Sequence, residues 1–192
     1  MVTTTHFATT IYEDSLEDDA LVAALAHSIR TLAQDDGAGR RWSRERGYRG
    51  YTSYASLNDL PARDPAFADL KRVLDRHVAA YAREAGFELT RKLRLDSLWV
   101  NLLRPGGAHS GHIHPHSAVS GTLWIEAPPG AGAIRFEDPR LPLMMAAPLR
   151  AGTFVTVDPA PGKLALWESW LRHEVLPHGG KGERLSVSFN YA

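Results

Sequence analysis

Strand-like sequence begins at Leu95-Asp96-Ser97-Leu98-Trp99-Val100-Asn101-Leu102-Leu103, which alternates and is rich in Leu and Val. Similar short runs follow it, at Gly111–His114, Val119–Ala127, Ala133–Phe136, Thr153–Val157, Leu164–Trp167, Leu171–Val175 and Arg184–Tyr191. Gly and Pro stand in nearly every gap between these runs, as turns require. About eight short strands separated by turns predict a jelly roll, also called a double-stranded β-helix.

The residues before Leu95 are patterned for helices. One helix is expected over Ser15–Leu32, with Ser15 as its N-terminal cap and apolar residues at helical spacing behind it. A second is expected over Asp64–Ala85, where Asp64 is the cap and Pro65 takes the first helical position. The segment Arg40–Tyr54 between them is interpreted as a long ordered loop.

Together these patterns predict a mainly β chain with flanking helices, of the α+β class. We expect a single domain over residues 1–192, in which residues 1–94 form a helical N-terminal portion and residues 95–192 form the double-stranded β-helix core. The apolar stripes of both helices need a sheet face to cover. The helices are therefore expected on the outside of one of two facing sheets.

The overall composition excludes several kinds of site. The chain has no cysteine, which removes disulfides, thiolate metal sites and cysteine nucleophiles. Its 22 basic and 22 acidic residues give a net charge of zero, so no general attraction to nucleic acid or to an anionic membrane is expected. No apolar stretch approaches the length of a membrane span, and the N-terminus lacks a signal-peptide pattern. We therefore expect a cytoplasmic protein.

Histidines provide the main chemical signal. His112 and His114 lie two residues apart in a predicted strand, so they point to the same face, and His173 lies in a distant predicted strand. Three imidazoles arranged in this way can bind one metal ion. His109 and His116 are the alternative ligands, although His109 is out of phase and His116 follows Pro115. A surface loop with several titrating histidines is the non-functional interpretation.

A second signal lies in the last predicted strand, where Arg184, Ser186, Ser188 and Asn190 alternate with apolar residues. An amphipathic strand with a solvated outer face would give the same pattern. Together with the histidines, however, it favours a polar lining inside a barrel. Arg184 and Ser186 then offer a cation and a hydroxyl that suit a carboxylate. A metal beside such a group suggests an oxygenase that uses an oxo-acid cosubstrate.

Tryptophans and one asparagine complete the set of candidates. Trp99 and Asn101 share one face of the strand that starts at Leu95, where they either reach the cosubstrate and metal or pack in the core. Trp124, Trp167 and Trp170 are expected in the core. No Gly-x-Ser-x-Gly, phosphate-loop or dinucleotide motif is present.

The chain resembles a family of iron(II)/2-oxoglutarate-dependent oxygenases, clearly from Trp99 to Tyr191. The stretches that carry the resemblance are Trp99-Val100-Asn101, His112-Ile113-His114-Pro115-His116-Ser117, Ser120-Gly121-Thr122, Glu137-Asp138-Pro139-Arg140, Trp167–His173 and Glu183–Asn190. The resemblance implies a double-stranded β-helix with iron(II) on His112, His114 and His173. It also implies that Arg184, helped by Ser186, binds the cosubstrate 2-oxoglutarate, with Trp99 and Asn101 close to it.

One departure from the wider superfamily stands out. The usual iron triad is two histidines and a carboxylate, and His114 occupies the carboxylate position. The expected function is hydroxylation of a small molecule or peptide, with 2-oxoglutarate converted to succinate. The alternatives are a cupin-like three-histidine metalloenzyme that does not use 2-oxoglutarate, and a non-catalytic module that binds a metal or a small acid. Loops such as Arg40–Tyr54 and Glu137–Pro148 are expected to select the substrate.

Overall fold

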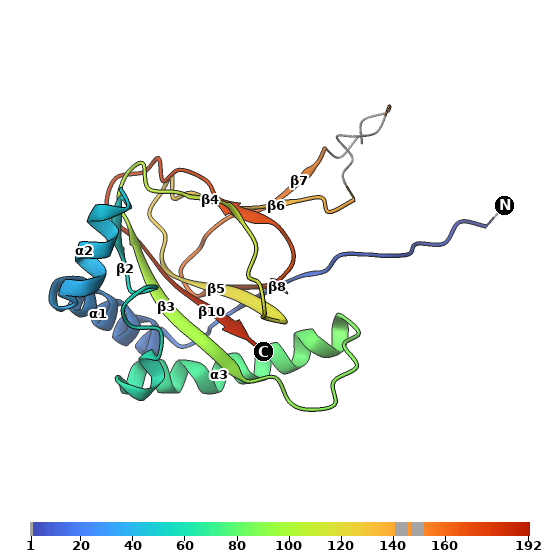
Figure 1. Ribbon diagram of the computed structural model, residues 1–192, viewed down its shortest axis with the longest axis horizontal. Helices are drawn as coiled ribbons and strands as arrows, with labels where there is room; N and C mark the ends of the chain where they lie inside the picture. Colours follow the sequence, from blue (N-terminus) through green and yellow to red (C-terminus); the bar gives the residue numbers. More distant parts are fainter. Residues whose placement is uncertain (1, 141–145, 147–151) are drawn as a thin grey trace.

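The computed structural model describes residues 2–140, 146 and 152–192. It consists of two facing antiparallel sheets with helices on one side (Figure 1). The helical elements are α1 (Asp19–Asp35), α2 (Gly37–Glu45), the short 3-10 helix η1 (Leu60–Ala62) and α3 (Pro65–Glu84). The strands are β1 (Ile11–Ser15), β2 (Gly50–Thr52), β3 (Leu95–Leu103), β4 (His109–His112), β5 (Val119–Glu126), β6 (Ile134–Glu137), β7 (Phe154–Val157), β8 (Lys163–Glu168), β9 (His173–Val175) and β10 (Arg184–Tyr191).

The larger sheet has six strands in the order β1-β8-β5-β10-β3-β2, and the smaller has the order β4-β9-β6-β7. Most neighbouring strands are not consecutive in the chain, because the chain passes back and forth between the two sheets. This arrangement is the predicted double-stranded β-helix. It brings β4 and β9, which carry histidines, opposite β10 and β3, which carry the polar set (Figure 1).

Strand parity divides the side chains of the larger sheet between two environments. On β10, Leu185, Val187 and Phe189 are fully buried in a core that also contains Leu25 of α1 and Leu74 of α3. Residues of opposite parity face the smaller sheet. The helices α1 and α3 therefore cover the outer face of the larger sheet, as their apolar stripes predict (Figure 1).

A second, smaller core lies between the two sheets. It consists of Trp124, Ile134, Phe136, Val157, Ala165, Trp167 and Leu171. Trp124 and Trp167 are buried as expected, whereas Trp170 is 48 % exposed, so its assignment to the core is wrong. The apolar contacts of this core hold the two sheets together. A polar cavity adjoins this core, since Ile134 and Trp167 also line it.

The first predicted helix begins later than expected. Ser15 is the last residue of β1, opposite Lys163 of β8, and the helix is capped by Asp18, whose carboxylate accepts from the Leu21 backbone N–H at 2.9 Å. Tertiary pairing with β8 therefore takes Ser15 into the sheet. The second helix follows the prediction, with Asp64 as cap, Pro65 at the first position and Gly86 in the left-handed region (φ 77°) just past the end.

The segment Arg40–Tyr54 is not a loop, and this prediction is wrong. The carboxylate of Asp36 accepts from the Gly39 backbone N–H at 2.9 Å and so starts helix α2 directly after α1. Strand β2 then pairs with β3, with Gly50 opposite Leu103 and Thr52 opposite Asn101. A Cβ at Gly50 would lie 1.8 Å from the Leu102 carbonyl oxygen, so this close pairing requires glycine.

The N-terminal portion thus contributes two edge strands, β1 and β2, to the larger sheet, in addition to its helices. The single-domain boundaries remain a prediction. Within Glu137–Pro148, residues 141–145 and 147–148 lie outside the described residues. Of the helices that the structure describes, none is long and apolar enough to cross a membrane.

Candidate active site

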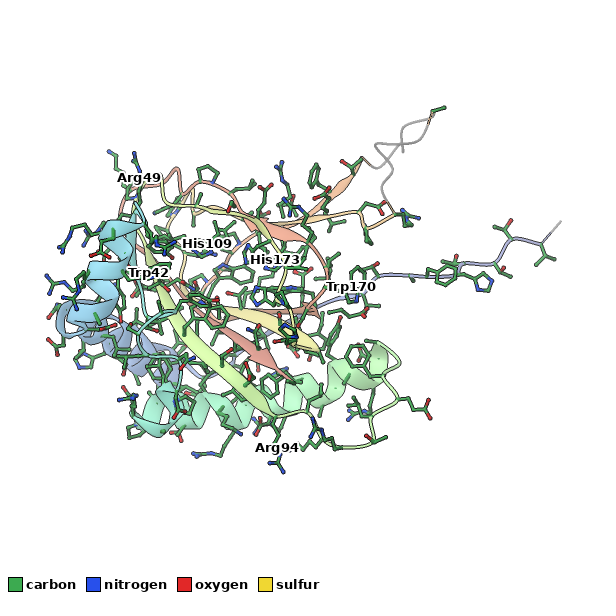
Figure 2. All side chains as sticks on the ribbon, in the orientation of Figure 1. Trp42, Arg49, Arg94, His109, Trp170 and His173 are labelled. Atoms are coloured by element: carbon green, nitrogen blue, oxygen red, sulfur yellow. The ribbon has the colours of Figure 1, made fainter. Side chains whose placement is uncertain are left out.

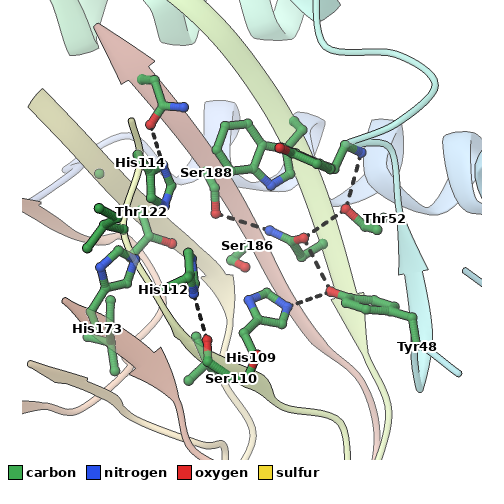
Figure 3. A pocket seen from close by; sticks show the side chains of 18 of the residues that line it. Tyr48, Thr52, His109, Ser110, His112, His114, Thr122, His173, Ser186 and Ser188 are labelled. Atoms are coloured by element: carbon green, nitrogen blue, oxygen red, sulfur yellow. Dashed lines mark hydrogen bonds between the residues drawn. The ribbon is translucent and has the colours of Figure 1, made fainter. Parts of the chain in front are cut away.

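A cavity of about 550 Å³ lies between the two sheets. Its wall includes the alternating polar residues of β10, namely Arg184, Ser186, Ser188 and Asn190, together with Trp99 and Asn101 of β3. The polar face of β10 is therefore an inner lining, and the solvated-face interpretation is wrong. His112, His114 and His173 gather at one side of the cavity, and Tyr48 and His109 lie at the other side, with Ser186 between them (Figure 3).

The three histidines named from the sequence form one cluster. Each offers a ring nitrogen, and these three nitrogens lie within 4.8 Å of one another, as a shared metal ion would require. His112 is the last residue of β4 and stands opposite His173, the first residue of β9. Figure 2 shows His173 inside the barrel, between the two sheets.

The predicted reason for the His112–His114 pairing is wrong, although the cluster itself is found. Strand β4 ends at His112, and its expected bounds, Gly111–His114, are shifted by two residues. His114 lies in the following turn, where its backbone N–H donates to the Ser169 carbonyl at 2.9 Å. Cross-strand pairing and this turn therefore bring the rings together, rather than two positions on one face of one strand.

The Nδ1 atom of each ring lies beside an oxygen acceptor. The acceptors are the Ser110 carbonyl for His112 (2.7 Å), the Leu171 carbonyl for His173 (2.9 Å) and the Asn190 side-chain oxygen for His114 (2.6 Å). Such contacts place the proton of a neutral imidazole on Nδ1 and leave the Nε2 lone pair for a metal. In agreement, His114 Nε2 is buried and has no hydrogen-bond partner among the described residues.

Burial keeps the deeper histidines neutral. Burial, together with the charges of neighbouring histidines, lowers the pKa of His173 to about 3 and that of His114 to about 4. No carboxylate belongs to the cluster within the described part of the chain. Glu174, next to His173, points the other way and forms an ion pair with Arg135. The ligand set therefore consists of neutral imidazoles.

These shifts predict that the metal-free protein loses stability in mild acid. The folded pKa values of His109, His114 and His173 lie at about 3 to 4, below an unfolded value of roughly 6.5. Below pH 6.5 the unfolded chain therefore takes up protons that the folded chain does not, and the free energy of unfolding falls as the pH falls. Urea unfolding at pH 7.5, 6 and 5 measures this effect. Equal stability at pH 7.5 and pH 5 would contradict it.

Arg184 is a buried cation. Its side chain is 1 % exposed, and no carboxylate forms an ion pair with it in the part of the chain that the structure describes. One guanidinium nitrogen donates to the Ser186 hydroxyl at 3.3 Å, and Nε has no partner. Burial lowers the pKa of Arg184 to about 10, which leaves it charged at neutral pH. A buried, uncompensated charge beside a cavity is well suited to an anionic ligand.

A hydrogen-bond network on the other side of the cavity holds residues that the sequence interpretation missed. The Asn101 oxygen accepts from Thr52 at 2.9 Å and from Tyr48 at 3.2 Å, and its amide donates to Ser188 at 3.0 Å (Figure 3). His109 Nε2 lies 2.8 Å from the Tyr48 oxygen. Since Tyr48 donates its proton to Asn101, we assign His109 as the donor to Tyr48. Burial raises the pKa of Tyr48 above its usual range and lowers that of His109 to about 3, so both are neutral.

The structure places the remaining candidate residues in different surroundings. Asn101 belongs to this network, and Trp99 stacks on the ring of His114 with 5.9 Å between the ring centroids. His109 lines the cavity but is not a member of the histidine cluster, and His116 is exposed. Tyr48 and Thr52 are the missed residues. The sequence feature that could have identified them is the alternation of Tyr48, Gly50, Thr52 and Tyr54, which is typical of a strand.

A family model matches the part of the chain that carries the histidine cluster and Arg184. Residues 97–190 match the family described as "Putative 2OG-Fe(II) oxygenase", where 2OG denotes 2-oxoglutarate. The matched segment runs from β3 to β10 and contains the three clustered histidines, Arg184 and Ser186. Among curated proteins, none matches the chain.

Solved structures share the fold along almost the entire chain. A prolyl-4-hydroxylase from Pseudomonas putida superposes with a TM-score of 0.68 at 22 % identity, covering 95 % of this chain and 92 % of that one. HygX from Streptomyces hygroscopicus, solved with nickel and 2-oxoglutarate bound, gives 0.65 at 16 % identity and covers 96 % and 82 %. The epimerase SnoN, solved with Fe3+, alpha ketoglutarate and nogalamycin RO, gives 0.67 at 17 % identity and covers 95 % and 78 %.

Proposed function

Over residues 97–190 this chain belongs to the iron(II)/2-oxoglutarate-dependent oxygenases, and we propose that its iron ligands are His112, His114 and His173. We further propose that Arg184 and Ser186 bind the distal carboxylate of 2-oxoglutarate. The observation that carries the proposal is the pairing, in one cavity, of a neutral three-imidazole cluster with a buried cation that has no acidic partner in the described residues.

The histidine cluster fits an iron(II) ion. Each of its three Nδ1 atoms is hydrogen-bonded to an oxygen acceptor. These contacts fix the ring orientations and leave the Nε2 atoms available to one metal ion. Asn190, which accepts from His114, also accepts from Ser120 at 2.9 Å, so the ring of His114 is supported from the larger sheet. Imidazole is a suitable ligand for iron.

The part of the cavity beside Arg184 and Ser186 fits 2-oxoglutarate. Arg184 supplies a planar guanidinium whose charge needs an anion, and Ser186 supplies a hydroxyl on the same strand face. The dianionic cosubstrate would also offset the positive charge that three neutral ligands leave on the metal. Trp99 and Asn101 also line the cavity, where they would restrict the space available to the cosubstrate.

The protein's own residues orient the reactants and exclude water. When bound, iron(II) supplies the oxidative chemistry by which 2-oxoglutarate and oxygen yield succinate and carbon dioxide, with one oxygen atom transferred to a substrate C–H bond. The buried histidines hold their orientation through Nδ1 contacts. Burial keeps these histidines unprotonated, and the burial of Arg184 away from water would strengthen its contact with a carboxylate.

The missing carboxylate favours one rival function. A three-imidazole site without an acidic ligand is also suited to a cupin-like metalloenzyme that does not use 2-oxoglutarate. Turnover of 2-oxoglutarate separates the two. A cytoplasmic location, the absence of a nucleic-acid partner and a small-molecule or peptide substrate remain predictions from the sequence.

The decisive experiment measures succinate. Purified protein is loaded with iron(II) under nitrogen, 2-oxoglutarate is added, and oxygen is then admitted. We expect succinate to form only when iron, 2-oxoglutarate and oxygen are all present, even without a known substrate, because such oxygenases turn over slowly in an uncoupled reaction. A sample kept under nitrogen is the control. If the iron-loaded protein neither binds nor consumes 2-oxoglutarate, the three-histidine metalloenzyme becomes the better assignment.

A further inference from the structure

We propose that the outer part of the active-site cavity binds the substrate through an aromatic wall, and that the substrate carries a flat ring together with an anionic group. The inference rests on the proposed function, because it concerns the molecule that the same site would oxidise. The wall consists of Trp42, Tyr54 and Trp99, and Arg46 lies beside it.

The three rings of the aromatic wall form a continuous series that ends at the histidine cluster. Trp42 and Tyr54 have centroids 6.4 Å apart, Tyr54 and Trp99 are 5.3 Å apart, and Trp99 stacks on His114 at 5.9 Å. All four residues line the cavity. A ring that packs against this wall would therefore place a neighbouring carbon close to the proposed iron.

The wall is exposed where a substrate would enter. Tyr54 is 57 % exposed and Ile113 is 47 % exposed, although both are large and border the cavity. Trp99, deeper in the series, is only 7 % exposed. Large apolar side chains left open at the mouth of a cavity are typical of ligand sites. Binding iron and 2-oxoglutarate does not require Tyr54 or Ile113, so a different ligand would explain their exposure at the cavity.

The geometry favours a flat ring. Tyr54 meets Trp99 edge to face, with 71° between the ring planes, and it is tilted by 58° from Trp42. Aromatic rings packed in this way present both faces and edges, which are the surfaces that a further ring contacts in stacked or T-shaped geometry. Ile113 and Pro115, which flank His114 in sequence, add apolar surface to the same cavity.

The charge near the wall favours an anion. Along the described part of the chain, no Asp, Glu or Lys lines the cavity, and its charged residue is Arg184, which the cosubstrate would occupy. The guanidinium of Arg46 lies 5.7 Å from the centre of the Trp42 ring. Of the other arginines between residues 37 and 50, Arg40, Arg44 and Arg49 line a separate pocket, so the positive charge at this rim is that of Arg46 beside Trp42. A cationic substrate would be repelled at this rim, whereas an anionic one would be attracted.

The test uses three small probes that differ in one property each. The probes are 3-(2-naphthyl)propanoate, which has a ring and a negative charge, 3-(2-naphthyl)propylamine, which has the ring with a positive charge, and octanoate, which has the charge without the ring. Each is titrated calorimetrically into the full chain loaded with iron(II) and saturated with 2-oxoglutarate under nitrogen. Saturation keeps the probe carboxylates away from Arg184. We expect the naphthylpropanoate to bind about tenfold or more tightly than either of the others.

Substitutions then test whether naphthylpropanoate binds at the aromatic wall. Tyr54→Ala should weaken naphthylpropanoate binding about 2- to 12-fold, the range of one aromatic pair, whereas Tyr54→Phe should bind it like the parent. Trp170→Ala is the matched control, since Trp170 is also exposed but does not line the cavity. Arg46→Gln should reduce the preference for the propanoate over the amine about 2- to 5-fold.

The same titrations separate the two possible failures. If the parent binds no 2-oxoglutarate, the proposed function is overturned and this inference with it. If it binds 2-oxoglutarate but octanoate binds as tightly as naphthylpropanoate, or if Tyr54→Ala has no effect, the aromatic subsite alone is overturned. Equal binding of the amine and the propanoate would overturn the anionic character of the substrate.

Discussion

Arg184→Ala is expected to lose 2-oxoglutarate binding by about 30-fold to several thousand-fold. Loss of a buried charged hydrogen bond costs roughly 2–5 kcal/mol, which corresponds to that range. The large value is expected because the Arg184 side chain is 1 % exposed and has no competing acidic partner among the described residues. Titration calorimetry of the iron-loaded variant under nitrogen measures the effect.

Two further variants refine this result. Arg184→Lys should restore binding only partly, because a single ammonium cannot reproduce the planar guanidinium. Ser186→Ala should cost about 1 kcal/mol, as for an ordinary hydrogen bond. Arg104→Ala, which changes an arginine whose side chain is 67 % exposed, is the control and should bind like the parent. If Arg184→Ala binds 2-oxoglutarate as tightly as the parent while keeping its iron, the assignment of Arg184 is wrong.

His173→Ala is expected to abolish stoichiometric iron binding. It removes one of three ligands, so the affinity should fall by more than the roughly 10- to 100-fold that loss of a supporting hydrogen bond costs. His173 is the informative position, because it is 3 % exposed and comes from a different strand than His112. Metal analysis after anaerobic loading and desalting gives the iron content.

His116→Ala is the matched control for this variant, since His116 is close in sequence but exposed and outside the cluster. It should keep the iron content of the parent. Far-UV circular dichroism checks that His173→Ala remains folded, because its ring packs 4.6 Å from that of Trp167. Full iron content in folded His173→Ala would exclude His173 as a ligand and make His109 the next candidate.

The strands of the core could be predicted from the sequence because their alternation is strong. The bounds of β3 and β10 agree with those expected, and the polar parity of β10 correctly placed Arg184 and Ser186 on one face. The facing sheets and the outer helices followed from the need to cover apolar faces. These features depend on local pattern, which a sequence displays directly.

The errors arose where tertiary pairing decides the structure. Ser15 can cap a helix as well as end a strand, and pairing with β8 makes it part of β1. The pattern of Arg40–Tyr54 predicts a loop, yet Asp36 caps a new helix that runs into this segment. Strand parity predicted the histidine cluster that the structure shows, but His114 lies beyond the end of β4 and not on the same strand face as His112. The turn at His114 is held by the Ser169 carbonyl, a contact that lies 55 residues away in sequence and leaves no local pattern.

The cavity wall has two origins along the chain. The histidine cluster, Arg184 and Ser186 lie within residues 97–190, whereas Trp42, Tyr48, Thr52 and Tyr54 come from α2, β2 and the residues around them. Part of the proposed substrate surface, Trp42 and Tyr54, is thus carried by a segment separate from the histidine cluster, and the pairing of β2 with β3 joins the two. A chimera that exchanges residues 36–54 with those of another chain of the same fold would redirect selectivity while leaving the reactive centre intact.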